Sequence, residues 1–199
     1  MDFLNPAFSS LPALLADIQI SFEYSGLALE ADAYSFTQSF NNVTFDNVLK
    51  YVAFPAVHVK DWRDKPERLA PLEKARGRFD MLFFFNWLRE KKVKRILKVI
   101  VEDNEQPPHS DEAIELALQG FDVETLDWSK PDLEPETICN ACDKLKDVVL
   151  HWSGNNAVLR AWSDPEGLRK LSKLSVINLI VDDVSGPQQI EDLFSTPDL

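Results

Sequence analysis

The chain has 199 residues, of which 45% are hydrophobic and 27% charged, a composition that is ordinary for a soluble globular protein. This length suits one domain, or a small domain fused to a repeat segment. No apolar run approaches the roughly 20 residues that a membrane-spanning helix needs, and the longest, residues 81–85, ends at Asn86. The N-terminal residues lack the features of a secretory signal, so we expect an intracellular, cytoplasmic protein.

The formal net charge of −12 is spread unevenly along the chain. Residues 1–59 carry one Lys or Arg and six acids, residues 60–98 carry 13 and six, and residues 99–199 carry seven and 21. Proteins that bind the phosphates of nucleic acids rely on Lys and Arg, so the acidic second half argues against nucleic acid as the partner. An acidic surface favours a basic protein partner instead.

Residues 1–78 are predicted to form a small N-terminal α/β cap. Within it, residues 17–23 and 56–60 alternate apolar and polar side chains, as half-buried strands do. Residues 63–78 are rich in charge, contain two prolines and are predicted to form a long loop. The aromatic stretch 79–92 is typical of a buried helix, which we expect to cover the open end of the sheet that follows.

Residues 79–199 repeat one unit, in which a short apolar β-run is followed by a polar turn and a short amphipathic helix. Aligned on Val101, Trp128, Trp152 and Val181, the β-runs recur at steps of 27, 24 and 29 residues. Units of this size cannot bury their own apolar faces, so they must stack on their neighbours. The helices are predicted over residues 111–121, 135–145 and 164–174, with an extra turn over residues 158–162 and one more helical turn around residues 188–194.

The predicted fold class is therefore α/β. We expect a short leucine-rich-repeat-like βα array with a mostly parallel sheet, in which the four β-runs lie side by side in chain order, preceded by the N-terminal cap. The alternative is a compact doubly wound sheet, which the short helices and connections disfavour.

Polar side chains at the ends of the second and third β-runs are predicted to share one face of this sheet. If the tryptophans that close the two runs are aligned, Asp127 lies beside His151, with Ser129 and Ser153 on the same face. The turn that follows contains Asn155 and Asn156. The predicted binding surface consists of Asp127, Ser129, His151, Ser153, Asn155 and Asn156.

Asp127, His151 and Ser153 are also the residue types of a nucleophilic triad, which makes a hydrolase the alternative function. His151 and Ser153 are only two residues apart along one strand, however. The sequence has no strand-to-helix elbow at Ser153 and no evident oxyanion donors. We therefore expect these residues to form part of an interaction face rather than a catalytic site.

Metal and redox chemistry also have sequence candidates. Cys139 and Cys142 have the spacing of a redox dithiol, but they lie inside a predicted helix, behind two acids that oppose thiolate formation. The acidic pairs 102–103 and 182–183 would lie about 14 Å apart in a sequential sheet, too far to share one cation.

His58 and His109 are each isolated in the sequence and lie near predicted turns. No glycine-rich loop follows any β-run, so a nucleotide site is not expected. We accordingly expect neither a metal nor a cofactor.

Several stretches resemble a segment of large fungal proteins that also carry a subtilisin-like serine-protease domain. The resemblance covers roughly residues 40–181, and its most specific run is Trp-Ser-Gly-Asn-Asn-Ala-Val-Leu-Arg at residues 152–160. The other matching stretches are residues 83–89, 93–101, 108–114 and 166–168. In those proteins the segment lies outside the protease domain and contains none of its catalytic motifs.

The resemblance implies a fungal module that accompanies a protease and regulates it or recognises its target. Together with the repeat pattern, it predicts a non-catalytic protein-interaction or regulatory module. A chain that works only when fused to a protease is a further alternative.

Overall fold

The structure is a computed structural model that describes residues 20–24, 29–60, 62, 72 and 74–181. Its main element is a six-stranded, fully parallel sheet with the strand order β1-β3-β5-β6-β7-β8. The strands are β1 (Phe22–Glu23), β3 (Val48–Phe54), β5 (Arg95–Val101), β6 (Asp122–Pro131), β7 (Asp147–Trp152) and β8 (Val176–Val181). A second, two-stranded parallel sheet joins β2 (Glu30–Asp32) to β4 (His58–Lys60).

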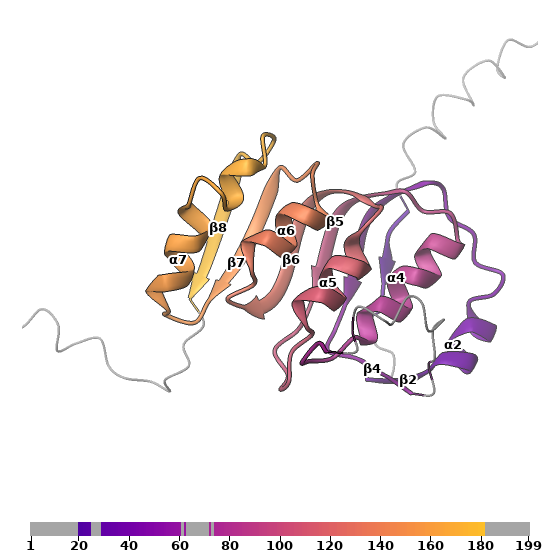
Figure 1. Cartoon of the computed structure of the whole chain (residues 1–199). Helices are drawn as coiled ribbons and strands as arrows, with labels where there is room; N and C mark the ends of the chain where they lie inside the picture. The colour runs from indigo at the N-terminus through magenta and orange to yellow at the C-terminus, as the bar shows by residue number, and fades with distance from the viewer. Residues whose placement is uncertain (1–19, 25–28, 61, 63–71, 73, 182–199) are drawn as a thin grey trace, which may run out of the picture.

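The helices lie along one face of the large sheet (Figure 1). They are α2 (Ala33–Ser39), α4 (Asp80–Glu90), α5 (Asp111–Leu118), α6 (Pro135–Ala141), α7 (Asn156–Ser163) and the 3₁₀ turn η2 (Leu168–Lys170). Crossovers between parallel strands are right-handed, and the sheet from β3 onward grows in one direction only. Successive helices are therefore placed on the same side.

The predicted α/β class is confirmed, and so is the order of the four β-runs, which are the neighbouring strands β5, β6, β7 and β8. The sheet does not stop at the start of this array, because β3 pairs with β5 over Val48 to Phe54. The sequence predicted that helix α4 covers the open end of the sheet. This prediction is wrong, because β3 lies at that position. Helix α4 lies across the strands, and its aromatic side chains contact Phe22, Phe54 and Trp128.

The last predicted helix is also placed differently. Residues 164–174 were expected to be helical, but α7 begins earlier, at Asn156, and only the short turn η2 follows it. Asn155 accepts a hydrogen bond from the Ala157 N–H and so provides the N-cap. Gly167 separates α7 from η2, and a Cβ at this position would lie 2.2 Å from the Ala161 carbonyl oxygen. The helical turn predicted around residues 188–194 lies outside the described residues.

Three rows of buried side chains run across the strands on the helix side. In β3, β5 and β6 the buried residues are separated by three and then two positions, the L-x-x-L-x-L spacing of leucine-rich repeats. The register of the parallel strands aligns these positions from one unit to the next. The rows are Leu49, Ile96 and Val123; Val52, Val99, Leu126 and Val148; and Phe54, Val101 and Trp128.

We expect this burial to dominate the stability of the array. Substituting Leu126, which is 1% exposed, with Ala should lower the free energy of unfolding by about 2–5 kcal/mol, because the cavity is enclosed by neighbouring strands. The adjacent Thr125→Ala variant should cost less than about 1 kcal/mol, since Thr125 is only half-buried and loses one weak bond to Asp147. Urea unfolding of both variants measures this difference, and equal losses would contradict it.

Candidate interaction surface

The face of the large sheet that the helices leave open carries the predicted site. One row of this face consists of Ala53, Ile100, Asp127, Val149 and Asn178, which are aligned across the five strands from β3 to β8. Each of these side chains is half-buried or exposed, whereas the rows on the helix side are almost fully buried. We call this row and its neighbours on the same side of the sheet the open face.

Asp127 and His151 meet on the open face, with 3.4 Å between Asp127 Oδ1 and His151 Nε2. The register that brings them together differs from the predicted one. Asp127 lies opposite Val149, and an irregularity in β6 then places Pro131 opposite His151. The contact therefore joins neighbouring strands diagonally, because β6 contains extra residues beyond Asp127.

Ser153 does not complete a triad with this pair. Its hydroxyl donates a hydrogen bond to Asp132 Oδ2, and its backbone N–H donates to Asp132 Oδ1 at 3.0 Å. Asp132 adopts a positive φ of 58°, and its own N–H donates to the His151 carbonyl at 2.8 Å. Asp132 thus ties the end of β6 to β7, and Ser153 is part of that connection.

The remaining predicted surface residues have structural contacts. Ser129 accepts a hydrogen bond from the Asp103 N–H at 2.6 Å. Asn155 caps α7, and its carbonyl accepts a hydrogen bond from the Trp152 indole at 2.9 Å. Asn156, the first residue of α7, is exposed. Of the six predicted residues, the half-buried Asp127 and the exposed Asn156 thus keep accessible polar groups on the surface.

A buried polar network at the carboxyl end of β5 was not predicted. Asp103 is 0% exposed and accepts hydrogen bonds from the Arg78 guanidinium at 3.0 Å and the Trp128 indole at 2.9 Å. It also bonds the backbone N–H and Nδ1 of His109, at 3.1 and 2.8 Å. The second nitrogen of His109, Nε2, accepts from the Met81 N–H. The network joins the residues before α4, the residues before α5 and strand β6.

His58 and His109, which are isolated in the sequence, both have side-chain partners in the structure. His109 is a member of this buried network, and His58 Nε2 lies 2.6 Å from Glu105 Oε2. Glu105 in turn bonds Arg78, so His58 is linked to the edge of the network. A signal for the network was available in the sequence, since Asp103 follows a buried strand and His109 precedes the N-cap residue Ser110.

The cysteines are free thiols packed against the core. Burial raises the pKa of Cys142 to about 12 and also raises the pKa of Cys139. Both changes disfavour the thiolate that redox chemistry requires.

Among the described residues, no three His, Cys, Asp or Glu side chains are grouped so that they could hold a metal ion. The acidic pair at residues 182–183 lies outside that part of the chain.

Acidic side chains gather where α5 and α6 begin. Burial raises the pKa of Glu134, and the nearby carboxylates of Asp111, Glu136 and Glu112 raise it further. Lys130 forms an ion pair with Asp111 at 2.9 Å and offsets part of this charge. Several carboxylates therefore lie close together near the carboxyl end of β6. In the described part of the chain, no helix is long and apolar enough to cross a membrane.

No protein-family model, no curated protein and no solved structure matches this chain. The expected relation to the fungal protease-associated segment therefore stays a prediction. Inferences about function depend on the geometry of the open face and its surroundings.

The buried Asp103 should make stability depend on pH. Burial by itself raises the pKa of this carboxyl, but the hydrogen bonds from His109 and Trp128 hold it below its ordinary value of 3.8. A carboxyl with a lowered folded-state pKa stabilises the fold above its unfolded-state pKa, and this contribution is lost as the pH falls through the folded-state value.

We therefore expect the stability difference between the native protein and Asp103→Asn to shrink as the pH falls from about 6 to about 3. Urea midpoints across this range measure the difference. Asp143→Asn, at an exposed position, is the matched control and should show no such trend. A difference that is constant with pH would contradict the role given to the Asp103 charge.

A fluorophosphonate probe should leave Ser153 unlabelled, because the Ser153 hydroxyl is bonded to Asp132 rather than to a histidine base. Peptide mapping by mass spectrometry gives the result directly. Labelling at Ser153 that disappears in the His151→Ala variant would restore the hydrolase alternative.

Proposed function

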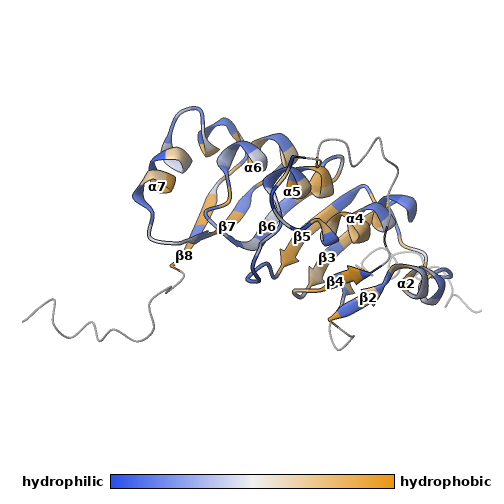
Figure 2. Cartoon of the chain, turned by 60° about the horizontal axis from the view of Figure 1, so that its bottom comes forward, coloured by the Kyte–Doolittle hydropathy of each residue, from blue (hydrophilic) through white to orange (hydrophobic). Residues whose placement is uncertain are grey.

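We propose that this chain is a non-catalytic protein-interaction or regulatory module that binds a protein partner on the open face. The observation that carries the proposal is the contrast between the two sides of the sheet. Helices cover one side of the sheet from β3 to β7, whereas the row containing Ile100, Asp127 and Val149 on the other side is left accessible (Figure 1, Figure 2). A broad, rigid strand surface of this kind is what repeat arrays offer to protein partners.

The chemistry of the surface favours a partner with basic side chains. Asp127 lies in the central row, Asp147 lies in the neighbouring row beside Thr125, and the cluster around Glu134 adds negative charge at the strand ends. Apolar side chains such as Ile100 and Val149 lie between these charges. A partner that combines an apolar contact with Lys or Arg would complement both features.

The family resemblance extends the proposal to a class of partner. A module similar to a segment of fungal proteins with a subtilisin-like protease domain would accompany such a protease, and would regulate it or recognise its target. The engagement of Ser153 by Asp132 and the absence of any triad contact to Ser153 among the described residues are consistent with a module that is not itself the hydrolase.

Binding to a purified fungal subtilisin-like protease tests this proposal. We expect saturable binding by the native chain, weakened at least about tenfold by Asp127→Lys, because the substitution reverses the charge at the centre of the open face. Glu90→Lys makes the same charge change at an exposed position on α4 and should leave binding unchanged.

Biolayer interferometry gives the affinities, and peptide hydrolysis by the protease shows whether binding regulates it. If the protease does not bind, the association with subtilisin-like enzymes is wrong. If, in addition, the native chain and Asp127→Lys capture the same proteins from a fungal lysate, the open face is not an interaction surface.

A further inference from the structure

Strand β8 ends the sheet with an exposed apolar edge. Five of its six residues are apolar, and all six are exposed, with values of 43–57% for Val176, Ile177, Leu179, Ile180 and Val181. Among the described residues, β8 pairs only with β7, so the backbone N–H and C=O groups of its outer edge have no strand beside them. Edge strands of monomeric proteins are usually short, charged or covered, and within the part of the chain that the structure describes β8 has none of these protections.

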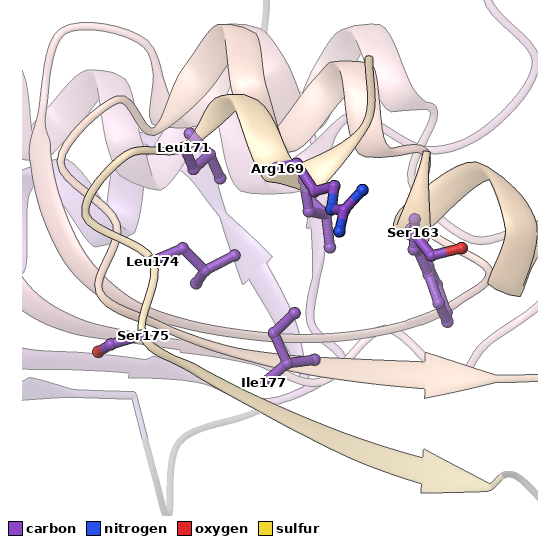
Figure 3. Close-up of a pocket in the computed structure, with 8 residues that line it drawn as sticks. Ser163, Arg169, Leu171, Leu174, Ser175 and Ile177 are labelled. Atoms are coloured by element: carbon purple, nitrogen blue, oxygen red, sulfur yellow. The ribbon is translucent and has the colours of Figure 1, made fainter. Parts of the chain in front are cut away.

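A hollow of about 530 Å³ lies beside this edge, between the helix layer and the start of β8. Figure 3 shows Leu171, Leu174 and Ile177 directed into it, with Arg169 and Ser163 towards its other end. The buried rows of the array end here, because Ile177 continues the row of Val148 and has nothing beyond it among the described residues. The sheet and the helix layer are therefore both left unfinished at β8, where no further described element packs against them.

The apolar residues of β8 are arranged symmetrically about Asn178, over residues 176–180. Ile177 and Leu179 flank Asn178 on one face of the strand, and Val176 and Ile180 flank it on the other. In an antiparallel pair of identical strands, two residues lie opposite each other when their numbers have a constant sum. Centring the pair on Asn178 places Ile177 opposite Leu179 and Val176 opposite Ile180, so these four apolar residues meet apolar partners, whereas Val181 meets Ser175.

We propose that β8 pairs antiparallel with β8 of a second copy of this chain, with the two Asn178 residues facing each other at the twofold axis. The two amide side chains can hydrogen-bond to each other there, and a polar pair inside an apolar contact fixes the register. The contact is isologous, which is the commonest way in which identical chains form a closed dimer.

The proposed dimer would complete both unfinished layers. A twofold axis perpendicular to the sheet keeps the helices of both copies on the same side, so Leu179 of the second copy would cover the apolar hollow beside Ile177. The two open faces would also join into one surface. The dimer proposal does not depend on the protein partner proposed above.

Sedimentation velocity of the full chain across a concentration series tests the oligomeric state. We expect a monomer–dimer equilibrium that Ile180→Lys weakens at least about tenfold, since a lysine on an edge strand opposes pairing and is tolerated at an exposed position. Leu29→Lys, which changes a still more exposed apolar residue remote from β8, should leave the equilibrium unchanged.

Cysteine cross-linking tests the register. In a Cys139→Ser background, Asn178→Cys should form a disulfide-linked dimer under mild oxidation, because directly opposite Cα atoms lie within about 4.5–5.5 Å. Ile180→Cys should not, because the two copies of residue 180 would lie roughly 13 Å apart along the strands.

A chain that stays monomeric at every concentration overturns the proposal and leaves β8 to a strand of another protein. A dimer that is unaffected by Ile180→Lys, or one in which residues 178 and 180 cross-link equally, overturns it as well. The proposal stands only if dimerisation is lost in Ile180→Lys and cross-linking is specific to residue 178.

Discussion

Each βα unit of this protein can bury only part of its apolar surface within itself, and the remainder must be buried by the units on either side. The rows that run from Phe54 through Val101 to Trp128, and from Val52 to Val148, are the physical form of this requirement. Buried positions spaced by three and then two residues keep these rows in line from strand to strand. Because the units are added in one direction with right-handed crossovers, every helix falls on one side, and the other side of the sheet stays open. The fold and the proposed interaction surface thus have the same origin.

Two ionisable residues that could suggest a reactive site, Asp103 and Asp132, instead hold the array together. Asp103 is a fully buried carboxylate, which would be costly without compensation, and it is satisfied by Arg78, His109 and Trp128. These partners come from segments far apart in the sequence, so the network fixes the loops at the carboxyl ends of the strands. Asp132 has a similar role between β6 and β7, where it occupies the hydroxyl of Ser153. The carboxylates of Asp103 and Asp132 therefore both have structural partners.

The proposed function depends on the surface of the sheet. The open face offers a mixture of apolar and acidic side chains on a rigid sheet, and β8 offers an apolar strand edge with unpaired backbone groups. The two features are adjacent, since Asn178 belongs both to the central row of the open face and to the middle of β8. A second copy joined at this edge would double the area of the open face without changing its chemistry. Partner binding and self-association are therefore compatible uses of one sheet.

The sequence by itself determined the α/β class, the repeat of short units and the chain order of β5 to β8, because hydrophobic periodicity depends on local spacing. It also placed Asp127 and His151 on the same face, since a shift of two residues preserves the side of a strand. Only the tertiary structure decided the register between them, the choice of Asp132 as the partner of Ser153, and the burial of Asp103 with His109. Those outcomes depend on an irregularity in β6 and on contacts between residues more than 20 positions apart, and a single sequence does not encode such distances in any local pattern. The same limit applies to α4. Its aromatic side chains indicated that it is buried, but not that it contacts both β3, through Phe54, and β6, through Trp128.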